Sequence, residues 1–199
     1  MLVYQSKIRA IATLEGITPY SASRIHNEPM FENEDKQEYD RRTYLSHLYI
    51  NDAGEVVMPS FGIHDCLVNA AQYSGKQIKG QGKKTWTKKL ESGLIIFDDP
   101  SFGITPDQTI YSDINAHSSG QRGSGKRVLR RYPVILPPWR LTFPIEILDP
   151  IITEALLQEM FGIAGLLIGI GRSRPENRGK LGRFRLANME WQADRRLAA

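Results

Sequence analysis

The first element that the sequence predicts is a strand, because apolar and polar residues alternate from residue 7 to residue 14. The apolar positions lie two residues apart and are Ile8, Ala10, Ala12 and Leu14. A period of two places them on one face of a strand, and Gly16 is expected to end it. Other short apolar or alternating runs predict strands at residues 42–50, 55–58, 94–97, 128–136, 140–148, 166–170 and 184–186.

Two helices are predicted between these strands. The first covers residues 60–74, after Pro59 and before Gly75, which is expected to stop it. Its apolar stripe is formed by Ile63, Leu67, Ala70 and Ala71. The second is expected to begin at Asp149-Pro150, a capping residue followed by a proline in the first turn, and to continue to residue 160. Strands and helices in this order indicate an α+β fold.

Length and composition limit the chain to one globular domain. It has 199 residues, of which 41% are hydrophobic and 24% charged, a balance typical of a folded protein with one core. We therefore predict a single domain over residues 1–199. The only cysteine, Cys66, excludes an internal disulfide and fits a reducing compartment. It is expected to be a small core residue of the first helix.

Membrane association is not predicted. The most apolar run, residues 160–171, is shorter than the roughly 20 residues that cross a bilayer, and the first residues lack the apolar stretch of a signal peptide. The sequence therefore predicts a cytoplasmic protein with no membrane partner.

Charge is distributed unevenly along the chain. The formal net charge is only +4, but residues 28–40 are acidic and three later segments are basic. The first basic segment contains Lys76, Lys79, Lys83, Lys84, Lys88 and Lys89. The second contains Arg122, Lys126, Arg127, Arg130 and Arg131, and the third contains Arg172, Arg174, Arg178, Lys180, Arg183 and Arg185. Each cluster alone is typical of a solvated surface, but three together favour a polyanion partner. The acidic segment is expected to be a solvated loop, or a contact for a neighbour's basic face.

No motif for nucleotide, metal or cofactor chemistry is complete. Residues 120–127 nearly match a phosphate-binding P-loop, but Arg127 stands where a Ser or Thr would hold magnesium, and a strand is predicted to follow instead of a helix. No two histidines have the spacing of metal ligands; they are His26, His47, His64 and His117. We therefore expect no metal and no cofactor.

The most informative segment is rich in glycine and arginine and covers residues 162–184. Glycines such as Gly169 and Gly171 let the main chain approach a partner closely and expose amides to phosphate oxygens. Arginines in the same segment supply charge and forked donors for phosphates. The alternative is a tight helix-to-strand connection in which the glycines serve packing alone. The spacing favours neither interpretation over the other.

These residues resemble the glycine-rich signature of RAMP proteins, the RNA-binding subunits of CRISPR–Cas complexes. The matching pattern is Leu156-Leu157, then Gly165-x-x-x-Gly169-x-Gly171-x-x-Arg174, then Gly179-x-x-Gly182-Arg183-Phe184. The turn Gly54-x-Val56-x-Met58-Pro59, the helix after it and the lysine-rich segment are most similar to the repeated backbone subunit of the effector complex. The resemblance implies an RRM-like (ferredoxin-like) fold, an antiparallel sheet with packed helices and basic loop insertions.

The resemblance also implies a non-catalytic subunit that coats a guide RNA in a CRISPR-type ribonucleoprotein. Its partners would be single-stranded RNA, other copies of itself, other subunits and, in the complex, a target nucleic acid. Trp86, inside the lysine run, is either a base-stacking ring or a core aromatic. The predicted RNA contacts are Lys76, Lys79, Lys83, Lys84, Trp86, Lys88, Arg122, Lys126, Arg127, Gly169, Gly171, Arg172, Arg174 and Arg183.

Two other functions remain open on the sequence. Some RAMP relatives are endoribonucleases that cut CRISPR repeats, and His26 lies soon after the first strand, where a histidine could act as general acid or base. A general single-strand-binding protein would also carry basic loops. A defined RNA length per protomer would distinguish the backbone subunit from the general binder, and cleavage of an RNA hairpin would indicate the nuclease.

Overall fold

A four-stranded antiparallel sheet with two helices on one face forms the centre of the molecule. The computed structural model describes residues 8–22, 24–117 and 127–193. The sheet has the strand order β5-β8-β1-β9, and its strands are β1 (Ile8–Gly16), β5 (Leu94–Ile95), β8 (Arg140–Ile147) and β9 (Phe184–Ala193). Helices α2 (Ser60–Ser74) and α4 (Glu154–Ile163) complete the chain order β1-α2-β5-β8-α4-β9. This is the βαββαβ arrangement of ferredoxin-like folds, so the predicted fold class is confirmed.

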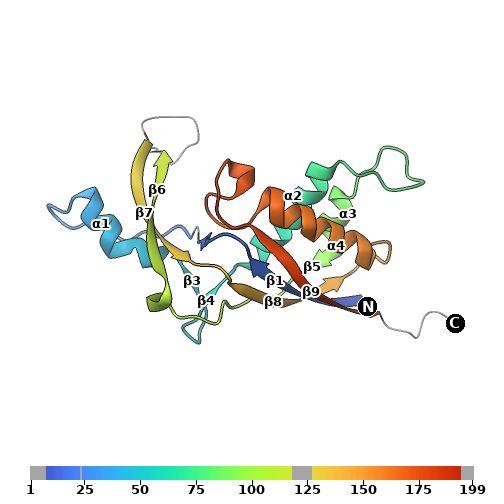
Figure 1. Ribbon diagram of the computed structural model, residues 1–199, viewed down its shortest axis with the longest axis horizontal. Helices are drawn as coiled ribbons and strands as arrows, with labels where there is room; N and C mark the ends of the chain where they lie inside the picture. The colour runs from blue at the N-terminus through green and yellow to red at the C-terminus, as the bar shows by residue number, and fades with distance from the viewer. Residues whose placement is uncertain (1–7, 23, 118–126, 194–199) are drawn as a thin grey trace, which may run out of the picture.

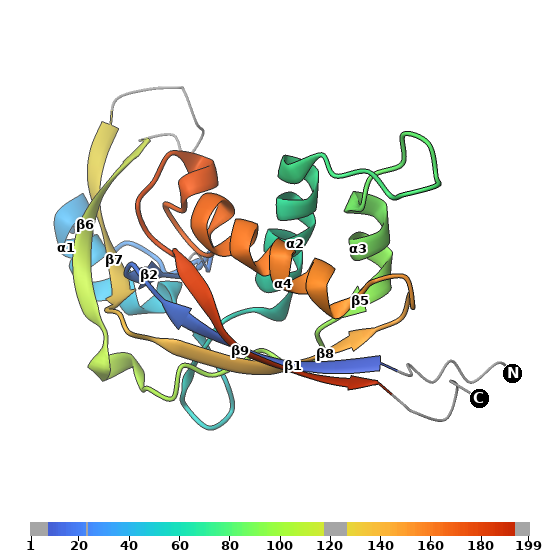
Figure 2. The same cartoon turned by 45° about the vertical axis from the view of Figure 1, so that its right-hand side comes forward.

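Alternation along the central strands explains why one face of this sheet is buried. Ala10 and Ala12 of β1 pair with Ile145 and Phe143 of β8, and all four side chains are buried. Because successive side chains point to opposite faces of a strand, the residues between them point away from the helices. Figure 2 shows α2, α3 and α4 on one side of the sheet only.

The ends of the two main helices have identifiable causes. The Ser60 amide at the start of α2 donates to Oδ1 of Asp99 at 2.7 Å. Gly75 ends α2 in the left-handed conformation, with φ of 59°, as predicted. Helix α4 begins later than predicted, because Thr153 is the capping residue and its hydroxyl accepts from the Leu156 amide at 3.3 Å. Asp149 caps only the turn before the helix, accepting from the Ile151 amide.

Insertions between the ferredoxin-like elements form both ends of the molecule. A second antiparallel sheet has the order β2-β7-β6 and consists of β2 (Tyr20–Ser21), β7 (Arg127–Ile135) and β6 (Ile110–His117). It is accompanied by α1 (Lys36–Thr43), the 3-10 turn η1 (Tyr44–His47) and the short pair β3 (Tyr49–Ile50) and β4 (Val56–Val57). Helix α3 (Thr87–Gly93) contains Lys88 and Lys89, the last two lysines of the lysine-rich segment. Figure 1 shows α1 and the β6–β7 hairpin at one end of the long axis and residues 76–86 at the other.

Two predicted strands are wrong. Residues 42–50 were expected to be extended, but helix α1 and turn η1 occupy most of this range. The cause lies upstream, where Asp35 accepts from the amides of Gln37 and Glu38 and so starts a helix within the acidic segment. Residues 166–170 are also not a strand.

The second error has a different cause. Helix α4 continues into the π-helical turn η3 (Ala164–Ile168), in which the Gly169 amide donates to the Ala164 carbonyl at 2.7 Å. A short apolar run can be a strand or a buried helical segment, and periodicity alone does not separate them. Both strands predicted on either side of Pro137-Pro138 are present, as β7 and β8, and they belong to two different sheets.

Candidate nucleic-acid interface

The glycine-rich loop, residues 169–182, joins η3 to β9 and folds back on the protein's own main chain. Gly171 has φ of 76°, and a Cβ there would lie 2.4 Å from the Ser21 carbonyl oxygen. Gly182 has φ of 71°, and a Cβ there would lie 1.8 Å from the Ile170 carbonyl oxygen. Both positions therefore require glycine, for conformation and for space. The close approach that these glycines permit in the structure is to neighbouring main chain, which supports the packing interpretation of the motif.

Hydrogen bonds fix the loop between β2 and α2. The Arg172 amide donates to the Ser21 carbonyl and the Gly182 amide to the Pro19 carbonyl, both at 2.8 Å. The thiol of Cys66, on α2, donates to the Gly169 carbonyl with the sulfur 3.3 Å away. Burial raises the pKa of this thiol well above its usual range, so it remains protonated and acts as a donor. Cys66 is a core residue, as predicted.

The three predicted arginines of this region make different contacts: Arg172 and Arg183 reach residues outside the loop, whereas Arg174 bonds within it. The Arg172 guanidinium lies over the Tyr132 ring, 3.8 Å from its centroid, and burial lowers its pKa. Nε of Arg174 donates to Glu176 at 2.8 Å. Nε of Arg183 donates to the Leu166 carbonyl at 3.1 Å. A guanidinium has five N–H donors, so each of these contacts leaves donors that a phosphate could use.

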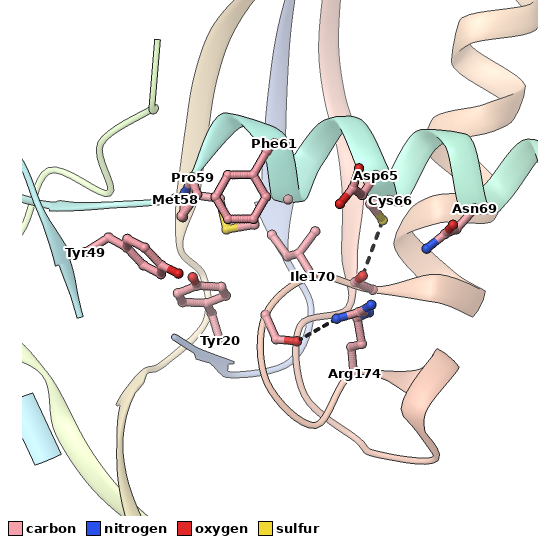
Figure 3. A pocket seen from close by; sticks show the side chains of 13 residues that line it. Tyr20, Tyr49, Met58, Pro59, Phe61, Asp65, Cys66, Asn69, Ile170 and Arg174 are labelled. Carbon is pink, nitrogen blue, oxygen red and sulfur yellow. Dashed lines mark hydrogen bonds between the residues drawn. The ribbon is translucent and has the colours of Figure 1, made fainter. Parts of the chain in front are cut away.

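A pocket of about 100 Å³ opens between this loop and the first turns of α2. Figure 3 shows the Tyr20 and Tyr49 rings at one end, Phe61 above them, and Arg174 facing α2 from the loop. Its remaining polar side chains are Asp65 and Asn69, four residues apart on α2. Residues at this spacing lie on the same face of a helix. The pocket thus combines aromatic walls, hydrogen-bonding groups and a cation.

The lysine-rich segment lies at the opposite end of α2 and forms a short hairpin at residues 76–86, here called the lysine hairpin. Gln77 and Thr85 form an isolated antiparallel bridge, and the Ile78 amide donates to the Lys84 carbonyl at 2.8 Å. The exposed lysines of the hairpin are Lys76, Lys79, Lys83 and Lys84. The hairpin follows Gly75 at the C-terminal end of α2, and Figure 2 shows it on the other side of α2 from the glycine-rich loop.

Several basic residues predicted to contact RNA are engaged with carboxylates. Lys76 forms an ion pair with Glu159 of α4, and Lys88 pairs with Glu91 at 3.2 Å. Trp86 packs against the core, and its buried Nε1 has no hydrogen-bond partner in the described part of the chain. Of the two interpretations of Trp86, the structure therefore favours the core aromatic.

The second basic cluster is only partly described. Arg122 and Lys126 lie outside the described residues, and Arg127 is placed by its main chain alone, at the start of β7. Two other members of the cluster form ion pairs. Arg130 pairs with Asp40 at 3.2 Å and Arg131 with Asp113 at 3.1 Å.

Two histidines distant in sequence meet beside this second sheet. The His26 and His47 rings lie 4.5 Å apart, centroid to centroid, and His47 also contacts the Tyr132 ring at 4.8 Å. Nδ1 of His47 lies 2.8 Å from the Arg24 carbonyl and donates to it. Burial lowers the pKa of His47 to about 4, so its ring is neutral at pH 7.

On the uncovered face of the ferredoxin-like sheet, the described residues of the central strands β1 and β8 include none of the aromatic side chains that RRM domains use to stack bases. On its central strands β1 and β8, the outward-facing residues that the structure describes are Arg9, Ile11, Thr13, Glu15, Arg140, Thr142, Pro144 and Glu146. Several form ion pairs across the strands: Arg9 with Glu146 at 3.4 Å, and Glu15 with Arg140 and Arg185. A base that approached these two strands would therefore find no aromatic side chain on which to stack.

Among residues 8–22, 24–117 and 127–193, no helix is long and apolar enough to cross a membrane. Within the same part of the chain, no group of His, Cys, Asp or Glu side chains could hold a metal ion.

Sequence comparison identifies no relative, whereas structure comparison does. No protein-family model and no curated sequence matches the chain. One similar structure is a chain of the Type III-B Cmr-beta bound to cognate target RNA, solved by cryo-EM; the TM-score is 0.55 at 12% identity, and the match covers 94% of this chain. Our chain spans 61% of that neighbour's length. Another is Cmr6 from Pyrococcus furiosus, with a TM-score of 0.45 at 12% identity, covering 94% of this chain and 100% of that one. The first similarity shows a shared fold.

Sequence reasoning missed the α2 side of the pocket. Phe61, Asp65 and Asn69 were not among the predicted contacts, although Phe61 carries a recognisable signal. It is an aromatic residue on the polar side of an amphipathic helix, away from the buried stripe of Ile63 and Leu67, and 62% of it is exposed. An exposed aromatic at such a position often contacts a ligand or partner.

Proposed function

We propose that this chain is a non-catalytic subunit that binds and coats a guide RNA in a CRISPR-type ribonucleoprotein, together with other copies of itself and other subunits. The observation that carries the proposal is the position of the glycine-rich loop. Its Arg174 side chain lines an open pocket that also contains aromatic and hydrogen-bonding side chains. Aromatic rings next to cations are the combination that binds single-stranded nucleic acid.

The distribution of side chains over the sheet supports this location. The charged outward residues of β1 and β8 form ion pairs of mixed sign, which offer phosphates no net positive surface. The loop side of the molecule carries three arginines, and of these only Arg174 pairs with a carboxylate in the described part of the chain, that of Glu176. RNA is therefore expected on the side where the loop meets α2, and not across the open sheet as in an RRM domain.

The structural comparison supports the assembly part of the proposal. The Cmr-beta that contains the neighbouring chain is bound to cognate target RNA, and a shared fold makes a related role for this chain the working hypothesis. Copies that polymerise along RNA must present different front and back surfaces, which gives a heterologous, non-closing interface. We place the protein in such an assembly, in the cytoplasm.

Two measurements test the proposal. Purification followed by sequencing of co-purified nucleic acid is expected to recover RNA that contains repeat-derived sequence. Light scattering with and without long RNA is expected to show RNA-dependent multimers. A monomer that binds once per long RNA, with no sequence enrichment, would instead indicate a general single-strand-binding protein.

A second candidate function is supported by the contact between His26 and His47. Two imidazoles 4.5 Å apart, one of them neutral at pH 7, could supply the acid and the base for attack of a ribose 2′-hydroxyl on its own phosphate. On our proposal, purified protein leaves a labelled repeat hairpin intact with and without magnesium, and His26→Ala binds RNA almost as well as the parent. Specific cleavage that His26→Ala lowers about 10²- to 10⁴-fold, with binding retained, would instead identify a repeat-processing ribonuclease.

A further inference from the structure

We propose that the pocket between the glycine-rich loop and α2 binds one pyrimidine base of single-stranded RNA and gives the protein a base preference. This inference rests on the proposed function and assigns a ligand to one part of the same site. It concerns where a base is bound, whereas the arginines of the loop account for contacts to phosphates.

The size and walls of the pocket favour a single six-membered ring over a purine. Its volume is about 100 Å³, less than the cavity of about 150 Å³ that encloses benzene, so a pyrimidine would enter it only in part and keep one edge at the mouth. Met58 and the rings of Tyr20 and Tyr49 line one end. Because the pocket is open at its mouth, the ribose of a bound nucleotide can remain outside. The two fused rings of a purine would need more room than the enclosed part provides.

Phe61 provides a stacking surface at the mouth of the pocket. It lies in the first turn of α2 and is 62% exposed, so its ring contributes little to the core. An exposed aromatic beside an open pocket is the arrangement on which bases stack in single-strand-binding proteins. Figure 3 shows the ring directly above the pocket, over Met58.

The polar side chains match the edge of a pyrimidine. The carboxylate of Asp65 accepts hydrogen bonds, and its side chain is 68% exposed; uracil offers its N3–H and cytosine its amino group. The amide of Asn69 can both donate to a base carbonyl and accept from an N–H. Arg174 lies across the pocket from α2 and bonds to Glu176 and to the Gly171 carbonyl. Its remaining donors can reach the adjoining phosphate.

The test compares single-stranded oligouridine, oligocytidine and oligoadenosine of equal length, about 16 nucleotides, binding to the full chain. We expect both pyrimidine RNAs to bind more tightly than oligoadenosine. Phe61→Ala should weaken binding of oligouridine about tenfold, the typical cost of one lost stacking contact. Asn69→Ala should reduce the preference for uridine over adenosine several-fold.

Matched controls separate the pocket from a general loss of binding. Phe97 is another exposed aromatic, 69% exposed, after β5, and Phe97→Ala should leave oligouridine binding unchanged. Asn188 is exposed on β9 and provides the control for Asn69. Asn188→Ala should leave the preference for uridine over adenosine unchanged. Equal affinity of the parent protein for all three RNAs, with no effect of Phe61→Ala, would overturn the base pocket while leaving RNA binding intact. Failure of every RNA to bind would overturn the proposed function itself, and this inference with it.

Discussion

The glycine-rich loop and the lysine hairpin have similar compositions, but the loop is packed against the protein and the hairpin tip is not. Both contain glycines with positive φ and several cations. In the loop, a Cβ at Gly182 would overlap the Ile170 carbonyl. In the hairpin, Gly80 and Gly82 have φ of 80° and 64°, and a Cβ would meet nothing within 4 Å. The loop is part of the packed protein, whereas the hairpin tip is surrounded by solvent.

This difference separates two ways in which a basic, glycine-rich segment can serve RNA binding. Arg172 is held over the Tyr132 ring, so its charge is fixed in place before any ligand arrives, which lowers the entropic cost of binding. Lys79, Lys83 and Lys84 are exposed at the hairpin, and flexible lysines attract phosphates without fixing their position. We infer that the loop determines where RNA binds and that the hairpin adds affinity.

The largest expected effect is on stability and comes from paired glycine substitutions. Gly182→Ala forces a Cβ into backbone at an unfavourable φ and should lower the free energy of unfolding by about 3 kcal/mol or more. Gly80→Ala suffers only the unfavourable φ of 80° and should cost about 1 kcal/mol. Urea denaturation with unchanged m-values measures both. Equal losses would contradict the distinction between a packed loop and a solvated hairpin.

The second prediction concerns the dependence of stability on pH, through the ring of His47. The pKa of His47 is about 4 in the folded protein, lowered by burial, against about 6.5 when unfolded. Below pH 6.5 the unfolded state therefore takes up a proton more readily, and stability should fall as the pH drops from 6.5 to 4. Because the ring is half-buried, solvent screening reduces the loss to about 1 kcal/mol.

Substitution of His47 isolates this contribution. The ring lies close to the charges of Arg172 and Arg130, hydrogen-bonds the Arg24 carbonyl, and contacts the rings of His26 and Tyr132. His47→Asn retains a donor for the Arg24 carbonyl but cannot titrate, so the difference between parent and variant across pH 4 to 6.5 reports His47 itself. Unfolding curves that show the same pH slope for both proteins would assign the pH dependence to other groups.

The third and smallest effect is on the salt dependence of RNA binding. Affinity should fall linearly on a log–log salt plot with a slope of roughly 0.7 per neutralised phosphate, or about 3 for four contacts. Arg174→Ala and Lys84→Ala should each lower this slope by about 0.7 with an RNA of about 16 nucleotides. With an RNA of about 4 nucleotides, only Arg174→Ala should do so, because the hairpin lies at the far end of α2. Unchanged slopes in both variants would remove both segments from the binding site.

The elements predicted correctly are those in which local pattern and tertiary burial agree. Strand β1 alternates because one of its faces packs on the helices, and α2 has a full apolar stripe and a left-handed glycine at its end. The strand predicted at residues 166–170 was wrong because a short apolar run is compatible with a π-helical turn as well as with a strand. Strand β6 carries no strong alternation and was not predicted; its pairing with β7 defines it.

The site was predictable only in part, because it is assembled from distant segments. The glycine and arginine spacing identified the loop, but nothing local to the loop indicates that Phe61 and Asp65 lie opposite it. Conversely, the sequence predicted RNA contacts both in the lysine-rich segment and in the loop, but it did not show how the two lie in space. The structure places them on different sides of α2 (Figure 2), and two of the lysines are engaged by Glu159 and Glu91.

The most direct test of the central claim is a map of where RNA touches the protein. Single-stranded RNA containing 4-thiouridine would be crosslinked to the intact chain by light, and the modified residues identified by mass spectrometry. We predict crosslinks to Tyr49, Phe61 and residues 169–174, with fewer at the lysine hairpin. Crosslinks confined to the outward face of β1 and β8, at residues such as Thr13 and Thr142, would contradict the account and place RNA on the open sheet.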